Sequence, residues 1–306
     1  MDVGLVEIGE TFEGYEVLAL LGKVGLGERY RVRRPDGGEA VLDVVAVHHP
    51  ELLARLQEAR LHRVEHPNLV SVHEVVPVLR FPGLVSDDGD VGVPLLAWLQ
   101  GEPPLEDREA VLRGLVAALD ALHGAGLSHG FLEPEAVWIA QPRFGEPVAR
   151  LGLPGVGSVL ADILGRGGAL TTAGGSTGSA GYRAPELQGR PGLCDPPSDL
   201  FSLGCLLYLL YEGEGPFDDF DPVAALDAAR REAYPRLERA PPEAATLIRE
   251  LLHADPMARP TAAHLVDAVD RAVPANGVPW LALASVSVAS LAITSALVYA
   301  WTVFAR

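Results

Sequence analysis

The hydrophobic pattern divides the chain into two unequal parts. Between residues 15 and 47, apolar and polar side chains alternate in runs that predict β-strands, and the dipeptide Asp36-Gly37 between two runs indicates a hairpin. A helix is predicted over 50–64, and a region broken by Gly and Pro follows residue 139 and runs to about residue 181. Apolar residues recur at helical spacing over 107–126, 198–213, 221–233, 241–254 and 261–273. The pattern therefore predicts an α+β protein with a small strand-rich part and a larger helical part.

The C-terminal residues form a separate apolar run. Trp280 to Phe304 carry no charge, and about 25 residues at a helical rise of 1.5 Å span roughly 37 Å, against roughly 30 Å of bilayer hydrocarbon. Aromatic residues lie near both ends, where they favour the membrane interface. We predict a tail over 1–11, a linker over 274–279 and a transmembrane helix over 280–304. Because the N-terminus lacks a signal-peptide pattern, we expect a single-pass membrane protein whose large N-terminal part is cytoplasmic.

The charge balance narrows the choice of partners. The chain has 41 acidic residues against 24 Lys and Arg, which gives a formal net charge of −17. An acidic surface repels phosphate backbones, so nucleic acid is not an expected partner. Cys194 and Cys205 are the only cysteines and suggest no disulfide framework.

Several short motifs follow one another in a fixed order. They are LLGKVGLGERYRV with Gly22, Gly25 and Gly27, then EAVLDVV, LSHGFLEPEAV, LGLPGVG, GYRAPE, SDLFSLG and DPMARP. Together they resemble the motifs of the protein kinase family, most closely the bacterial Ser/Thr type, over residues 12–273. The resemblance implies a two-lobed fold, with a β-rich N-lobe over about 12–93 and a helical C-lobe over about 94–273.

The residues that hold the large lobe together in this family are present. The resemblance implies that His129 makes a spine contact and that Asp199 caps the backbone of the catalytic loop. It also implies an ion pair between Glu186 and Arg259. Glu58 stands at the position of the glutamate that pairs with the family's phosphate-gripping lysine.

The residues that carry the family's chemistry are absent. Asp43 stands where the family has the phosphate-gripping lysine, and Phe131 where it has the catalytic base. Ala136 and Leu153 replace both metal ligands, and Glu133 replaces a lysine that contacts phosphate. Mg²⁺ requires oxygen ligands, and a carboxylate at position 43 adds negative charge where phosphate oxygens would lie. We therefore expect no catalytic residue, metal or cofactor, and the substitutions argue against ATP binding.

The glycine-rich stretch is only partly retained. Val24 replaces its middle glycine, and Arg29 replaces the valine that covers adenine in the family. Lys23 lies within the stretch and could reach phosphates as a displaced lysine. That alternative is a Ser/Thr kinase with residual or atypical ATP-dependent transfer; we favour a solvated loop lysine.

The selective loss predicts a membrane-tethered pseudokinase that acts as a signalling scaffold or regulator. An active kinase at the same membrane could phosphorylate the segment after Gly155, and a phosphopeptide-binding domain could then dock there. The candidate acceptors are Thr171, Thr172, Ser176, Thr177 and Ser179. A purely structural membrane tether for a partner protein is the remaining alternative.

Two other motifs carry less weight. Gly174, Ser176 and Gly178 satisfy the GxSxG pattern, but no predicted strand precedes them, so a nucleophile elbow is not expected. His62 and His66 are four residues apart and could share a metal ion, yet no third ligand is evident.

Overall fold

The computed structural model describes residues 4–59, 61, 64–87, 92–143, 145–166, 171–172, 180–187 and 194–272. The chain divides into two units, Met1–Ala272 and Val273–Arg306, and every described residue belongs to the first. The predicted linker and transmembrane helix, 274–279 and 280–304, lie outside the described residues. Among the helices of the described part, none is long and apolar enough to cross a membrane.

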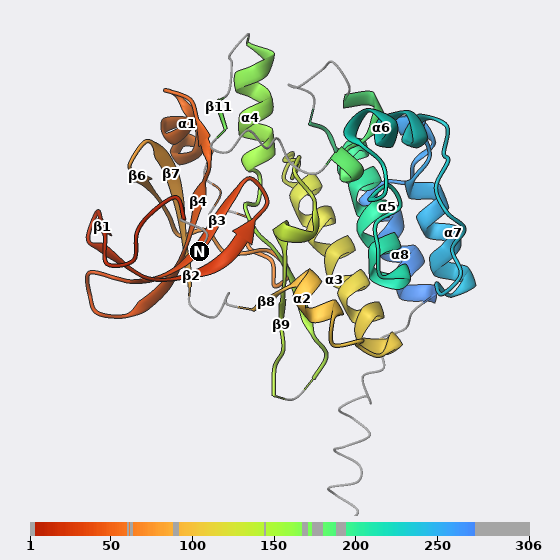
Figure 1. The fold of residues 1–306 in the computed structure, drawn as a ribbon, viewed down its shortest axis with the longest axis horizontal. Helices are drawn as coiled ribbons and strands as arrows, with labels where there is room; N and C mark the ends of the chain where they lie inside the picture. Colours follow the sequence, from red (N-terminus) through yellow and green to blue (C-terminus); the bar gives the residue numbers. More distant parts are fainter. Residues whose placement is uncertain are drawn as a thin grey trace, which may run out of the picture. The chain divides into compact units, whose positions relative to one another are not determined.

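The N-lobe is built on a six-stranded antiparallel sheet in the order β1-β2-β3-β4-β7-β6 (Figure 1). The strands are β1 (Thr11–Phe12), β2 (Tyr15–Val24), β3 (Gly27–Arg33), β4 (Glu39–Val45), β6 (Glu74–Val78) and β7 (Phe81–Asp87). The predicted hairpin is confirmed, because β3 and β4 pair across a turn in which Gly37 has φ 89°, a left-handed value that glycine adopts without strain. Apolar side chains, among them Val17, Tyr30 and Val32, form the core of this lobe.

One helix and one short strand pair complete the N-lobe side. Helix α1 (Leu52–Glu58) is shorter than the predicted 50–64. Strand β5 (Val47–His48) pairs antiparallel with β11 (Thr171–Thr172), which comes from a distant part of the sequence. Residues 171 and 172 thus pair with a strand that follows directly on β4, although more than 120 residues separate the two strands in the sequence.

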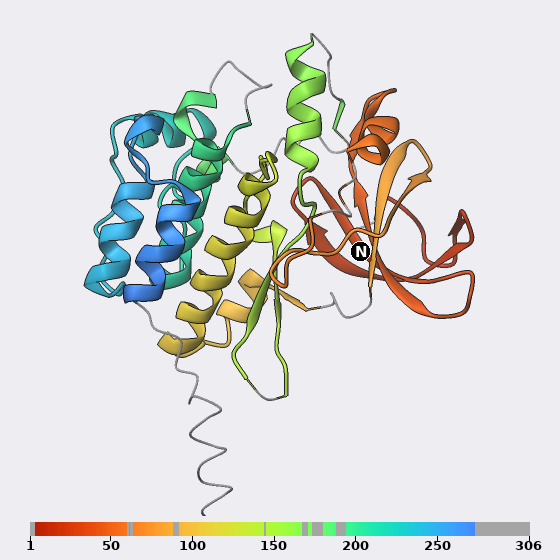
Figure 2. The same cartoon turned by 180° about the vertical axis from the view of Figure 1, so that it is seen from behind.

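The C-lobe is a group of helices around α5 (Pro196–Glu212), in which every residue from Ser198 to Tyr211 is buried. The start of α5 is fixed by a capping box, because Asp195 Oδ1 accepts from Ser198 N at 3.0 Å and Ser198 Oγ accepts from Asp195 N at 3.2 Å. The other helices of this lobe, seen from both sides in Figures 1 and 2, are α2 (Leu95–Leu99), α3 (Leu105–Gly124), α6 (Pro222–Arg230), α7 (Pro242–Leu251) and α8 (Ala262–Ala272).

A small sheet lies between the helices and the N-lobe. It has the order β10-β9-β8 and consists of β8 (Val93–Pro94), β9 (Val137–Ala140) and β10 (Val148–Leu151). The single-turn helix η3 (Pro134–Ala136) leads directly into β9. Three further single turns are η5 (Ala180–Tyr182), η6 (Pro185–Leu187) and η7 (Pro256–Ala258).

Two stretches differ from the sequence expectation. Residues 4–10 were expected in a tail, but Val6 is only 5% exposed and belongs to the N-lobe core, because its apolar side chain is sheltered there. The region expected to be broken by Gly and Pro contains helix α4 (Val156–Gly165). Gly155 precedes it with φ 73°, so the glycine reverses the chain before the helix and does not interrupt it.

Candidate functional site

The loop at 127–133 is held by one buried carboxylate. Asp199, 1% exposed, accepts from His129 N through Oδ2 and from Gly130 N through Oδ1, both at 2.7 Å. Asp199 lies in the first turn of α5, and its position follows from the cap at Asp195. Bonds from backbone N–H groups to a carboxylate are strong, so this contact sets the backbone path of the loop.

Two histidines complete this network. His123, near the end of α3, places Nε2 3.0 Å from Asp199 Oδ2, a contact that the sequence reasoning missed. His129 is 2% exposed, and its Nε2 donates to the carbonyl of Gly152 at 2.8 Å. Burial lowers the pKa of His129, so its ring stays neutral in the folded protein at neutral pH. The only sequence signal for His123 was its place at the end of a helical pattern.

Glu186 and Arg259 form a bidentate ion pair. Arg259 Nη1 lies 2.6 Å from Glu186 Oε1, and Nη2 lies 2.9 Å from Oε2. The guanidinium also donates to the carbonyls of His253 and Pro197, and it stands 5.0 Å from the ring centre of Phe201. Arg259 therefore ties η6 to the start of α5.

The negative charge of Asp43 is paired with a positively charged side chain. Asp43 lies directly opposite Arg29 in the β3–β4 register, and Arg29 Nε and Nη2 contact its two oxygens at 2.7 and 2.8 Å. Arg29 is 0% and Asp43 1% exposed, so the pair is buried. The expected repulsion between Asp43 and phosphate is corrected on this point, because Arg29 already balances the charge.

Arg29 also connects the N-lobe with the C-lobe. Its guanidinium carbon lies 4.5 Å from the centre of the Trp138 ring, and Trp138, on β9, is 1% exposed. A Cβ built at Gly152 would lie 2.5 Å from Val24 Cγ2 and 3.2 Å from Arg29 Nη2, so only glycine permits this approach. The sequence reasoning did not identify Trp138, because its role depends on a contact between distant segments.

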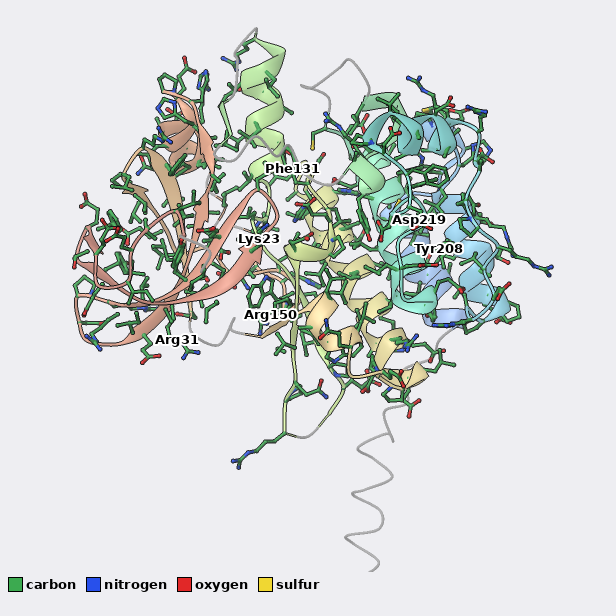
Figure 3. All side chains as sticks on the ribbon, viewed as in Figure 1. Lys23, Arg31, Phe131, Arg150, Tyr208 and Asp219 are labelled. Carbon is green, nitrogen blue, oxygen red and sulfur yellow. The ribbon has the colours of Figure 1, made fainter. Side chains whose placement is uncertain are left out.

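The tip of the β2–β3 hairpin packs on the substituted positions. A Cβ built at Gly25 would lie 3.6 Å from Leu153 Cδ1, 3.7 Å from Phe131 O and 3.8 Å from Ala136 Cβ. Leu153 is 3% and Ala136 0% exposed. Figure 3 labels Phe131 near the lower end of α4. The residues in place of the base and the metal ligands thus lie together beneath the glycine-rich hairpin.

An apolar cluster joins the two lobes at this point, and we call it the interlobe core. Its buried members are Val24, Leu26, Val45, Val47, Leu52, Leu56, Leu61, Val72, Leu84, Leu153, Val156, Val159, Leu160 and Ile163, with Ala59, Val75 and Phe131 partly buried against it. Because it includes side chains of α1 and α4, the helix after the LGLPGVG motif packs into the same core. Leu153, which is a member of this core, adopts φ 51°, an uncommon value for a non-glycine residue.

The remaining site residues lie apart from this core. Glu58 is at the end of α1 with its side chain 71% exposed, 3.8 Å from Arg55 Nη1, so it contacts neither Lys23 nor Arg29. Lys23 is exposed near the hairpin tip (Figure 3), and its side chain has no hydrogen bond or ion pair with any residue that the structure describes. Glu133 is 6% exposed and precedes η3.

The candidate phospho-acceptors are described only in part. Thr171 and Thr172 form β11, with Thr171 opposite His48 and Thr172 opposite Val47. Ser176, Thr177 and Ser179, the GxSxG pattern and His62 lie outside the described residues. Within the described part of the chain, no three His, Cys, Asp or Glu residues are grouped to hold a metal ion.

These residues do not fit a magnesium-bound nucleotide. The two metal-ligand positions carry only the hydrocarbon side chains of Ala136 and Leu153, and Mg²⁺ requires oxygen. The lysine position carries Asp43, whose oxygens are engaged by Arg29.

Known proteins resemble this chain over most of its length. Serine/threonine-protein kinase pkn3 of Myxococcus xanthus is 32% identical over 285 residues, which cover 87% of this chain and 51% of that protein. Serine/threonine-protein kinase AfsK of Streptomyces coelicolor is 28% identical over 82% of this chain and 31% of its own length. The chain thus spans about half or less of these two relatives.

A solved structure shows the same fold. The kinase domain of Mycobacterium tuberculosis PknI, determined as a double mutant, superposes with a TM-score of 0.63 at 22% identity, covering 87% of this chain and 98% of that domain. The family described as protein kinase domain matches residues 15–269. With its two lobes in the expected order, this chain belongs to the protein kinase family.

Proposed function

We propose that this protein is a pseudokinase, which acts by presenting a folded kinase domain to partner proteins and not by transferring phosphate. One observation carries the proposal: the positions that hold nucleotide and metal in the family are occupied by the interlobe core and by the buried pair Arg29–Asp43 under Trp138. Phosphoryl transfer depends on positioned charges and metal ions around the phosphates. Here these positions hold hydrocarbon side chains and a neutralised ion pair.

The energetics support the same proposal. A nucleotide that entered this region would have to displace packed side chains such as Val24 and Leu153, each at most 3% exposed. It would also separate Arg29 from Asp43, and breaking a buried ion pair costs about 3–5 kcal/mol. A nucleotide that binds without a metal ion would have to gain more free energy from its own contacts than these two costs together.

Residual kinase activity is the second candidate, and the relatives named above as serine/threonine-protein kinases favour it. Lys23 is the residue that would serve it, because it is exposed near the hairpin tip. The test is incorporation of radiolabelled γ-phosphate from ATP, with Mg²⁺ or Mn²⁺, into the protein itself and a basic carrier protein. We expect none above the enzyme-free control. Incorporation that Lys23→Ala abolishes would support the second candidate; incorporation unchanged in that variant indicates a contaminating kinase.

We further propose that the domain is held at a membrane by residues 280–304, since this run of the sequence is uncharged. A double substitution, Leu291→Arg with Ile293→Arg, places two charges near its centre, each unfavourable by about 2.5–3.5 kcal/mol. The variant should leave the membrane fraction, whereas Ala292→Leu should remain in it. Equal distribution of both variants would contradict a spanning role.

We also propose that the segment from Gly155 to Glu186 recruits a partner protein. Its hydroxyls, including Thr171 and Thr172, would receive phosphate from an active kinase, and the added charge would recruit a phosphopeptide-binding domain. Mass spectrometry of protein isolated from its own cells should find phosphate in this segment. An unmodified segment under all growth conditions would remove this mechanism and leave scaffolding through the unmodified surface, or a purely structural tether.

A further inference from the structure

Strand β3 is held from both of its faces. Successive side chains of a strand point to opposite sides, so Arg29 points away from the side occupied by Glu28 and Tyr30. Arg29 is fixed between Asp43 and Trp138, as described above. The opposite face of the same strand contacts residues 4–10, which lie before the first strand of the sheet.

The carboxylate of Glu28 receives this N-terminal segment. Its Oε2 accepts from Leu5 N at 2.6 Å and also from the hydroxyl of Tyr30. That hydroxyl in turn accepts from Val6 N at 3.2 Å. Burial raises the pKa of Tyr30, so its hydroxyl keeps the proton that it donates to Glu28. Bonds to a charged acceptor are stronger than neutral ones.

Packing and backbone bonds extend the contact along the segment. Val6 is 5% exposed and packs in the N-lobe core, and a Cβ built at Gly4 would lie 2.7 Å from Tyr30 Oη. Further along, Gly9 N donates to Val17 O at 2.8 Å, and Val17 N donates to Glu10 O at 2.8 Å. The segment is thus attached to both β2 and β3.

We infer that residues 4–10 act as an outer brace that ties β2 and β3 of the glycine-rich hairpin to each other and, through Val6, to the N-lobe core. The hairpin can lift only if β3 moves, and movement of β3 breaks the contacts of Arg29, those of Glu28, or both. Gly25 lies at its tip, and Gly22 and Gly27 lie in the flanking ends of β2 and β3; glycines by themselves favour mobility. The brace supplies a restraint that is independent of nucleotide, and a competitor for residues 4–10 would release it.

The test is amide hydrogen exchange of the full chain without nucleotide. Glu28→Ala removes the carboxylate acceptor, and Val6→Ser weakens the packing without changing β3. In each variant, amides of residues 18–30 should exchange at least about tenfold faster. For Glu28→Ala the cause is the loss of hydrogen bonds to a charged acceptor, and for Val6→Ser it is the loss of apolar packing. Amides of α5 should be unchanged. Arg33→Ala is the matched control, because Arg33 is on the same strand and pairs with Glu16 at the surface, with side chains 49% and 42% exposed.

Two outcomes would overturn the inference. Unchanged exchange of the hairpin in both Glu28→Ala and Val6→Ser would mean that residues 4–10 do not restrain it. Equal acceleration over hairpin and α5 would mean that the segment contributes only to global stability. Because no nucleotide is present, either outcome leaves the proposed pseudokinase function to be judged by its own assay.

Discussion

Asp43 and Asp199 are both buried carboxylates, each 1% exposed, but they are satisfied in different ways. Asp199 accepts from two backbone N–H groups and lies 3.0 Å from His123. Asp43 is engaged by one side chain, Arg29, on the neighbouring strand. The first carboxylate fixes a backbone path, and the second only neutralises its partner.

This difference shows that residues outside the loop at 127–133 set its backbone path, which does not depend on a polar side chain at position 131. The hydrogen bonds that Asp199 accepts and the pair Glu186–Arg259 do not involve the loop's own side chain at Phe131, which packs against the interlobe core. In the N-lobe, the charged groups face each other across β3 and β4, beside Trp138. In both places, the buried polar groups named here are paired within the protein.

The largest expected effect breaks the Arg29–Asp43 pair from one side. Asp43→Ala leaves the guanidinium buried without its counter-charge, so the free energy of unfolding should fall by about 3–5 kcal/mol. The double variant Arg29→Met with Asp43→Ala removes both charges and should recover most of that loss. Urea denaturation followed by circular dichroism measures both. If the double variant were as unstable as Asp43→Ala, the unpaired charge of Arg29 would not be the cause of the lost stability.

A smaller effect is expected at Asp199. Asp199→Asn keeps one acceptor oxygen but replaces the other by an NH₂ group, so one of the bonds from His129 N and Gly130 N is lost. The free energy of unfolding should fall by about 1.5–3 kcal/mol, the range for a hydrogen bond to a charged group. Glu250→Gln, the same type of change at an exposed carboxylate on α7, is the matched control and should leave the free energy of unfolding unchanged. If Asp199→Asn were as stable as the wild type, the carboxylate would not hold the loop.

The smallest effect concerns pH. Because burial lowers the pKa of His129 below its ordinary value of 6.5, the unfolded state binds a proton first as pH falls. The free energy of unfolding is therefore unaffected by His129 above about pH 6.5 and falls below that pH. For this one imidazole the fall is at most about 1.4 kcal/mol per pH unit. His129→Gln should show a shallower loss between pH 6.5 and 5.5. His66, whose pKa burial also lowers, adds a loss of the same sign in both proteins, so equal slopes would contradict the assignment to His129.

Much of the fold followed from local patterns. The hairpin at Asp36-Gly37 and the helices α3, α5, α6, α7 and α8 correspond to strong alternation or helical spacing. The short α1 and the position of α4 did not, because both depend on packing in the interlobe core. The attachment of residues 4–10 likewise depends on the hydroxyl of Tyr30 and the carboxylate of Glu28, which no local pattern reveals.

The site was predictable in its identities more than in its contacts. The motifs located Phe131, Ala136 and Leu153, whereas the partner of Asp43 was missed. A signal for it existed: a turn centred on Asp36 places residue 29 opposite residue 43, which is the observed register. Trp138 had no such signal, because its contact with Arg29 joins strands of different lobes.

The most direct test of the closed nucleotide region is binding of ATP to the whole protein, read as the shift in unfolding temperature with ATP alone, with Mg²⁺ alone and with both. A ligand at one hundred times its Kd stabilises a folded protein by about 2.7 kcal/mol, so occupancy would be evident. We predict no shift under any of the three conditions beyond the salt control. A shift that appears only when ATP and Mg²⁺ are present together would contradict the account.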